Sequence, residues 1–177
     1  MTSHQLKNPY GFFAPYIPMP KGRGFTARLV SGALPKADID RIIMAGVRSP
    51  SARNRQPWRF TVVGDPALGR KIIPQNLDGN VVVVISARGD GKTNGPEILD
   101  CALVAQSIYL AAQALGYGSR IYTGPVDRLN RMFKADAGLP AGHSAVVLVR
   151  FGRTAPAADG VSAASSRKAP GEAVVYR

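Results

Sequence analysis

The sequence is poor in the residues that build disulfides, metal clusters and membrane spans. Its 177 residues include one cysteine, Cys101, which excludes an internal disulfide and a cysteine-rich zinc site. The two histidines, His4 and His143, share no metal-ligand spacing, so no metal site is predicted. No apolar run approaches the roughly 18 residues of a membrane-spanning helix, and the first residues lack a signal peptide's apolar segment. We therefore expect a cytoplasmic protein with neither a metal nor a membrane partner.

Motifs of several common enzyme classes are also missing. There is no Gly-x-Gly-x-x-Gly after a strand, no phosphate-binding P-loop, no His-Glu-x-x-His and no Gly-x-Ser-x-Gly. A hydrolytic triad would need His4 or His143, and a lone histidine in a Gly-His-Ser turn is more often structural. Cys101 falls in an apolar helical stretch, where cysteine behaves as a small hydrophobe. Glu97 and Asp100 lie at the start of that helix, where acids suit the dipole, which favours capping over acid–base catalysis. We therefore predict no catalytic side chain.

Acidic residues are scarce beside basic ones. The chain has 23 Lys and Arg against 11 Asp and Glu, a formal charge of +12. The surplus concentrates in residues 1–88, with 13 basic and 4 acidic groups, and five arginines fall between Arg41 and Arg59. Such a field favours an anionic partner, either a polyanion or a phosphate-bearing small molecule. Aromatic residues make up only 7% and do not interleave with the basic ones, so we expect no nucleic-acid partner.

The composition is that of a globular chain long enough for one domain with its own core. It divides into three parts: a proline- and aromatic-rich arm at 1–22, a core at 23–153, and a linker and tail at 154–177. The linker is rich in Ala, Ser, Gly and Pro.

Hydrophobic periodicity predicts alternating helices and strands through the core. Helical spacing puts Ile39, Ile42, Ile43 and Val47 on one face of a helix that begins at Pro35. Further helices are predicted at 66–73 and 125–134, and strands at 58–63, 119–122 and 145–151. The pattern predicts an α+β (mixed α/β) fold, with a sheet covered by helices.

Three segments carry more specific expectations. The continuous apolar run at 81–85 predicts a strand covered on both faces. The helix at 97–115 is apolar on nearly every side, which predicts complete burial. Residues 174–176, Val-Val-Tyr, are strand-like, and a terminal strand must pair with something, such as another subunit.

The most informative loop is residues 49–60, SPSARNRQPWRF, between a predicted helix and a predicted strand. Its hydroxyl and amide groups could read a ring edge with mixed donors and acceptors, such as a pyrimidinedione. A solvated arginine-rich loop has the same residue types. Composition alone leaves both interpretations open.

The pattern Pro-Ser-x-x-Asn-x-Gln-Pro-Trp-x-Phe in this loop resembles the signature of the nitroreductase family of FMN-dependent enzymes. Other segments resemble the family's in the same order along roughly residues 23–176. They are Thr26-Ala27-Arg28 with Leu34-Pro35, the helix from Asp100 to Gly118-Ser119, the strand from Gly138 to Gly152, and Arg167-Lys168-x-Pro170 with Glu172. The chain departs from the family pattern at two positions. Gly24 stands where the family has its first arginine, with Arg23 one residue away, and Ala52 stands where the family has a second serine.

The resemblance implies a nitroreductase-like central sheet flanked by helices, in an intertwined homodimer with C-terminal strand exchange. The core at 23–153 would bind FMN at the subunit interface, and the tail at 154–177 would cross to the partner. Carried over by position, the cofactor-binding residues are Arg23, Thr26, Arg28, Pro50, Ser51, Ala52, Asn54, Gln56, Gln106, Thr123, Gly124, Arg167 and Lys168.

The resemblance also implies roles within this set. Thr26 and Arg28 would face the phosphate, the ribityl chain and the pyrimidine edge, and Arg167 with Lys168 would bind the phosphate. Pro50, Ser51 and Asn54 would contact the flavin from the partner subunit. Gln106 would lie near the helix face behind the ring. The backbone amides of Thr123 and Gly124 would reach flavin N5 and O4.

The implied activity is a ping-pong oxidoreductase. NADPH or NADH would give hydride to flavin N5, and a nitroaromatic, quinone or enone acceptor would then take the electrons. Protons can come from water, so no side chain need act as acid or base. Two alternatives stay open: a flavin-dependent dehydrogenase or oxidase of the same fold, and a flavin-free relative that acts as a binding protein.

Overall fold

The structure is a computed structural model that describes residues 28–89, 95–155 and 170–177. The predicted arm at 1–22 lies outside the described residues, as do most of the linker and four of the expected cofactor-binding residues. Those four are Arg23, Thr26, Arg167 and Lys168.

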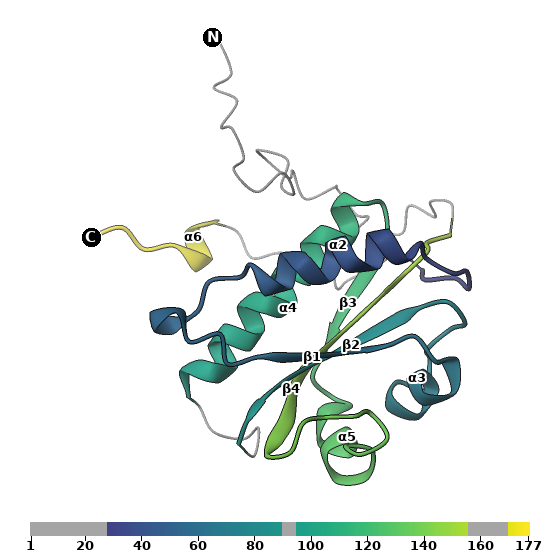
Figure 1. Ribbon diagram of the computed structural model, residues 1–177. Coiled ribbons are helices and arrows are strands. Elements are labelled where there is room, and N and C mark those ends of the chain that lie inside the picture. The colour runs from purple at the N-terminus through teal and green to yellow at the C-terminus, as the bar shows by residue number, and fades with distance from the viewer. Residues whose placement is uncertain (1–27, 90–94, 156–169) are drawn as a thin grey trace.

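A four-stranded antiparallel sheet forms the centre of the molecule, in the strand order β1–β2–β4–β3 (Figure 1). The strands are β1 Arg59–Val63, β2 Val81–Arg88, β3 Gly118–Tyr122 and β4 His143–Gly152. The sequence predicted all four. It missed the end of β2 and the start of β4, where polar residues continue the pairing as far as Arg88 opposite His143.

The inner strand β2 separates two hydrophobic clusters. Val83 and Ile85 point into one cluster and Val82 and Val84 into the other, and all four are fully buried. The prediction of a strand covered on both faces is therefore confirmed. β4 is covered in the same way, with Val149 on one face and Leu148 on the other.

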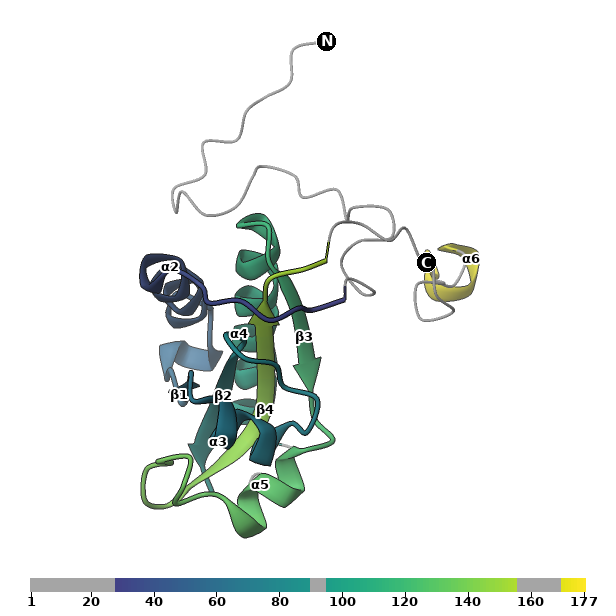
Figure 2. The same ribbon diagram turned by 90° about the vertical axis from the view of Figure 1, so that its right-hand side faces the viewer.

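Helices cover both faces of the sheet and make three layers (Figures 1 and 2). The first cluster lies under α2 and α4, and the second under α3 and α5. The helices are α2 Lys36–Val47, the 3-10 turn η1 Ala52–Asn54, α3 Pro66–Ile72, α4 Pro96–Ala114, α5 Val126–Met132 and α6 Pro170–Ala173. The predicted α+β class, with a sheet flanked by helices, is confirmed.

The expectation that α4 is buried on every side is wrong for the single chain. Leu99 and Leu103 are 68% and 46% exposed, and Ala102 and Gln106 on the same side are also exposed. The sheet can cover only one side of a helix that lies on it. In the described part of the chain, no element covers the outer stripe, although its composition is that of an interior helix.

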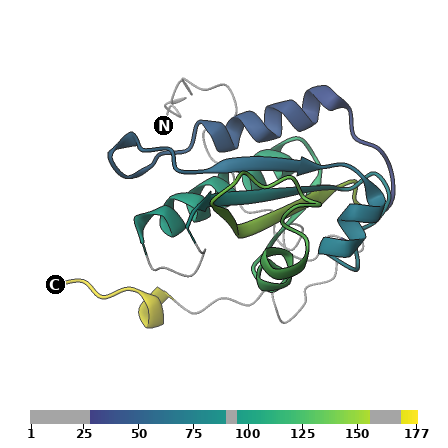
Figure 3. The same cartoon turned by 60° about the horizontal axis from the view of Figure 1, so that its bottom comes forward.

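Two smaller expectations also differ from the structure. Val47 of α2 was expected to face inward and is 40% exposed. Residues 174–176 do not form a strand: they follow α6 as irregular chain, and Val175 is 80% exposed. α6 stands apart from the three layers in every view (Figure 3). A strand needs a neighbour to bond with, and the described part of this chain offers these residues none.

The close approach of α2 to α4 depends on Gly46. A Cβ there would lie 2.8 Å from Cγ1 and 2.9 Å from Cδ1 of Ile108, closer than side chains normally pack. We expect Gly46→Val to lower the free energy of unfolding by about 1–3 kcal/mol, as overpacked cores do. Urea unfolding measures the difference.

The matched control is Gly64→Val, because a Cβ at Gly64 meets nothing within 4 Å. That variant should stay within about 0.5 kcal/mol of the parent. Equal unfolding midpoints for the two variants would show that the helices separate at no cost.

Candidate functional site

The loop at residues 49–57 is tied to α4 by buried and half-buried polar contacts. The Ala52 N–H donates to Asp100 Oδ1 at 3.0 Å, and the Asp100 side chain is almost fully buried. The Ser49 hydroxyl donates to Ser107 Oγ at 2.8 Å. Arg55 reaches Glu97 at 3.3 Å across the loop's exposed side. The loop is therefore fixed to α4 between Glu97 and Ser107.

Asp100 does not have the capping role that the sequence favoured. The residue that caps α4 is Gly95, which offers no side chain, and Asp100 instead accepts the backbone N–H of Ala52. The sequence did contain a sign of this role, because Asp100 is a carboxylate among the apolar residues of α4 and such a group needs a hydrogen-bond partner. Its partner, 48 residues away, could not be read from the sequence.

The backbone of this loop is strained. Arg53, Asn54 and Gln56 have φ of 54°, 54° and 49°, in the left-handed region that non-glycine residues rarely occupy. Residues held in such conformations cost about 1–3 kcal/mol each and persist only where their surroundings fix them. The Gln56 N–H donates to Ser51 Oγ at 3.0 Å, and its side-chain Nε2 donates to Asn54 Oδ1 at 3.0 Å.

The strained loop presents polar groups to solvent. Pro50, Ala52, Asn54 and Gln56 are exposed and Ser51 is half-buried. Strain of this kind concentrates at ligand-binding sites. The loop is thus a preorganised, open array of amide and hydroxyl groups.

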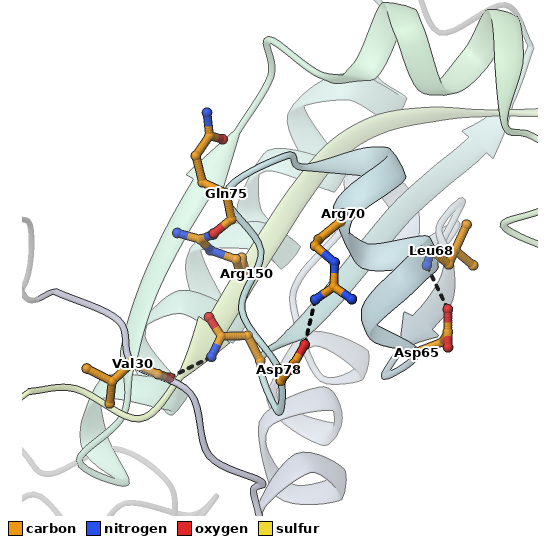
Figure 4. Close-up of polar contacts among 8 residues, drawn as sticks. Val30, Asp65, Leu68, Arg70, Gln75, Asp78 and Arg150 are labelled. Atoms are coloured by element: carbon orange, nitrogen blue, oxygen red, sulfur yellow. Dashed lines mark hydrogen bonds and ion pairs between the residues drawn. The ribbon is translucent and has the colours of Figure 1, made fainter.

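A second group of predicted residues begins with Arg28. Its carbonyl accepts the N–H of Ala155 at 3.0 Å, and Leu29 forms a bridge with Thr154. The Val30 carbonyl accepts Asn80 Nδ2 at 2.9 Å, from the loop before β2 (Figure 4). These bonds fix the backbone beside Arg28, whose side chain is exposed.

Two further features stabilise the loop that holds Asn80. Arg150 of β4 is nearly buried and donates from Nη1 to the Gln75 carbonyl at 2.5 Å (Figure 4). The pair between Arg70 and Asp78, also drawn in Figure 4, closes the loop on its exposed side. The support for Arg28 therefore extends from β4 through the loop at 75–80 to Val30.

Three other predicted residues lie on exposed surface. Thr123 and Gly124 form the turn after β3, where the Thr123 carbonyl accepts the Val126 N–H at 3.0 Å. A Cβ at Gly124 would meet nothing within 4 Å, so this stretch of backbone is open to approach. Gln106 lies on the exposed stripe of α4.

A single chain does not bring Arg28 and the strained loop together. The loop joins α4 at Asp100, whereas Leu29 lies against Gly118, which follows the other end of α4. From Asp100 to Ala112 the helix alone rises about 18 Å, at roughly 1.5 Å per residue. The described residues therefore form two separate half-sites at opposite ends of α4.

The two nucleophile candidates are poorly placed for catalysis. Burial raises the pKa of the Cys101 thiol to about 12, with the charges of Asp100 and Glu97 adding to the effect. His143 is only 8% exposed, and its pKa is lowered by burial and then by Arg59, Arg88 and Lys134. Cys101 thus behaves as the small hydrophobe that the sequence predicted.

The described residues form neither a metal-binding cluster nor a membrane-spanning helix. Across 28–89, 95–155 and 170–177, no three His, Cys, Asp or Glu side chains cluster closely enough to hold a metal ion. Among the helices described, none has the length and hydropathy of a membrane span.

Known proteins resemble this chain in sequence and in fold. A family model described as "Nitroreductase family" matches residues 31–88 and 77–153. A protein of Archaeoglobus fulgidus, provisionally named NADH dehydrogenase/NAD(P)H nitroreductase, is 32% identical over 103 residues, which are 54% of this chain. The matches span 59% and 51% of the lengths of the first two curated relatives.

Two solved structures share the fold. A nitroreductase with bound FMN from Desulfitobacterium hafniense DCB-2 has a TM-score of 0.69 at 19% identity, covering 87% of this chain and 94% of that one. A protein provisionally named a nitroreductase, in complex with FMN, from Desulfovibrio desulfuricans has a TM-score of 0.70 at 23% identity. That alignment covers 88% of this chain and 92% of the other.

The buried bond between Asp100 and Ala52 makes the loop's rigidity testable. Asp100→Ala leaves the Ala52 N–H without its acceptor, a loss of about 1–3 kcal/mol. We expect amide hydrogen exchange at Ala52 and Gln56 to become at least about fivefold faster, as measured by NMR.

Asp100→Asn is the control, since its amide oxygen can still accept the bond. Exchange at both amides should then stay near the parent rate. Equal acceleration in both variants would mean that the negative charge holds the loop rather than the hydrogen bond.

Proposed function

The chain belongs to the nitroreductase family, and from this premise we propose that it is an FMN-dependent oxidoreductase. It passes electrons from NADPH or NADH to a nitroaromatic, quinone or enone acceptor by a ping-pong sequence. The observation that carries the proposal is the strained, exposed loop at 51–56, held rigid against α4 in a chain of this fold. Neighbours of the same fold are described as binding FMN.

The residues present fit such a cofactor. A flavin's pyrimidine edge offers both donors and acceptors, and the amides of Asn54, Gln56 and Gln106 with the Ser51 hydroxyl offer both in return. Arg28 supplies a guanidinium, which suits a phosphate or the electron-rich side of the ring. Asn54, Gln56, Gln106 and Arg28 are all exposed, so folding of the described chain leaves them available.

Each part of the chain then has a distinct task. FMN, when bound, supplies at N5 the atom that accepts and returns hydride. Arg28 stabilises negative charge at the pyrimidine edge, and the backbone at Thr123–Gly124 orients the ring through its amides. Ser51 and Asn54 hold the ring from the partner subunit. Thr26, Arg167 and Lys168, with Arg23, complete the phosphate site.

No side chain serves as proton donor or nucleophile in this scheme. Cys101 stays a thiol at neutral pH because burial raises its pKa to about 12. His143 is buried, and its pairing with Arg88 places it on the sheet face opposite α4, away from the loop at 51–56. Water entering the open site delivers the protons, and the residues position reactants rather than react.

We propose a homodimer as the functional unit, because neither half-site is complete alone. Leu99, Leu103 and Gln106 form an exposed stripe along α4, with one half-site at each end. Antiparallel packing of two such stripes about a two-fold axis brings the loop of one copy to the Arg28 end of the other. The exposed residues 171–177 then have a second subunit on which to pair.

The flavin assignment predicts a yellow protein that bleaches under anaerobic NADPH or NADH. In Arg28→Ala we expect about tenfold or greater loss of FMN affinity, with slower bleaching, because a charge-assisted contact is lost. Absorbance titration and stopped-flow reduction measure the two effects. Arg131→Ala, an exposed cation on α5, is the control and should change neither.

Three outcomes would contradict parts of this proposal. A yellow protein that neither nucleotide bleaches would favour a dehydrogenase or oxidase of the same fold. A colourless protein that cannot be loaded with FMN would make it a flavin-free relative. Normal FMN retention and reduction in Arg28→Ala would remove that residue from the site.

The dimer predicts that assembly and cofactor binding fail together. Leu103→Glu places a charge in the centre of the stripe, so we expect monomers in sedimentation equilibrium and loss of bound FMN. Met132→Glu is matched in chemistry and is 64% exposed on α5, across the sheet from α4; it should leave both properties unchanged. A Leu103→Glu dimer with full FMN content would exclude this interface.

A further inference from the structure

A cluster of cations gathers at the end of the sheet where β4 begins. Arg88, the last residue of β2, is paired directly opposite His143, the first residue of β4. Arg59 begins β1 and pairs with Ser86, two residues before Arg88. Lys134 follows α5 and donates to the Ser144 hydroxyl at 3.2 Å. Four basic side chains from four segments therefore converge here, which we call the β4-start cluster.

The two arginines of the cluster, Arg59 and Arg88, face away from α4. Phe60 and Ala87 pack in the hydrophobic cluster on the α4 side of the sheet. Because neighbouring residues of a strand point to opposite faces, Arg59 and Arg88 point to the α5 side. Figures 1 and 2 show the start of β4 beside α5. The strained loop at 51–56 lies only three residues before Arg59 in the sequence, but it is bound to α4, which covers the other face of the sheet.

The positive charges of this cluster have no counter-ion among the described residues. The ion pairs there involve Asp38, Asp40, Asp78, Asp136 and Glu97, none of which pairs with a member of the cluster. Arg59 donates to the Trp58 carbonyl at 2.9 Å, a neutral acceptor. Arg59 and Arg88 are both exposed to solvent, and like charges held near one another repel, so a bound anion would relieve that repulsion.

His143 gives a second, independent observation. The residue is 8% exposed, and its buried Nδ1 has no hydrogen-bond partner among the described residues. Buried polar atoms are normally satisfied by protein, water or ligand. Burial, and after it the charges of Arg59, Arg88 and Lys134, lowers the pKa of this imidazole.

The cluster is also distant from the Arg28 half-site. β4 carries His143 at its start and Gly152 at its end, and the bridge between Leu29 and Thr154 lies just beyond. Ten strand residues span about 30 Å. A ligand here would therefore not touch Arg28, the described residue that is proposed to contact FMN at that end of the sheet.

We propose that the β4-start cluster binds the terminal phosphate group of a small molecule. Two guanidinium groups and one ammonium suit a doubly negative phosphate monoester, which accepts forked bonds from arginine and a point charge from lysine. A carboxylate would neutralise only one of the three cations. The surplus of +12 over the whole chain attracts anions to this surface before they bind.

Inorganic phosphate is the probe, titrated into FMN-saturated full-length protein at constant ionic strength, with sodium chloride as the balancing salt. The readout is the His143 imidazole resonance in NMR, assigned by its absence in His143→Gln. An anion beside the imidazole favours its charged form, so phosphate should raise the pKa of His143 above its value in chloride. Arg88→Gln should weaken phosphate binding about tenfold.

Arg131→Gln is the matched control, since it removes the same charge from α5 but is not among the groups that act on His143. Its phosphate affinity should equal that of the parent. Equal weakening in Arg88→Gln and Arg131→Gln would mean general attraction by net charge and would overturn the site. A His143 resonance that phosphate does not move would overturn it as well.

A competition experiment distinguishes a small phosphate ligand from nucleic acid. A 5′-phosphorylated nucleoside should compete with phosphate, whereas an oligonucleotide without a terminal phosphate should not. Tight oligonucleotide binding that falls steeply with salt would identify a nucleic-acid surface and overturn the proposal.

Discussion

The packing of α4 against β2 and β4 fixes the position of every element around the candidate site. Val104 and Ile108 are fully buried where the helix meets the sheet, and α2 crosses behind them at Gly46. Asp100, one turn into the same helix, holds the loop with the left-handed residues. The Arg28 segment lies beyond the helix's other end. The apolar contact that stabilises the fold thus also sets the separation of the two half-sites.

This arrangement explains why an apolar helix keeps one side exposed. Leu99 is 68% and Leu103 46% exposed, so burying what remains exposed would contribute about 1–2 kcal/mol and about 1 kcal/mol respectively, a stabilisation that a partner can provide. The proposed packing of two α4 helices would also bring together the two groups of site residues, which a single chain holds at opposite ends of the helix. In the proposed dimer, assembly and cofactor binding depend on one surface, and the exposed side chains of Val174, Val175 and Tyr176 offer further apolar surface to the partner.

Charge is distributed by a different rule. Three of the scarce acids of the described chain each contact one specific donor: Asp100 accepts a backbone N–H, Glu97 pairs with Arg55, and Asp78 pairs with Arg70. The cations left over do not spread evenly. Those of the β4-start cluster converge because strand pairing places Arg88 opposite His143, and β1 brings Arg59 alongside. The surplus of basic residues forms a candidate site only because the pairing of β1, β2 and β4 brings some of them together.

The sequence by itself determined the element order, the doubly covered strand at 81–85 and the loop that carries the family signature. These follow from short-range periodicity and from local residue types, which a linear pattern contains. The sequence-based prediction overestimated the burial of α4, because hydrophobic periodicity shows which sides of a helix are apolar but not which elements cover them. It assigned Asp100 to the helix dipole, because a bond to Ala52, 48 residues away, leaves no local trace. Tertiary structure alone decided that Arg28 and the strained loop stand apart and that Arg59, Arg88, Lys134 and His143 come together, since both depend on how the chain folds back on itself.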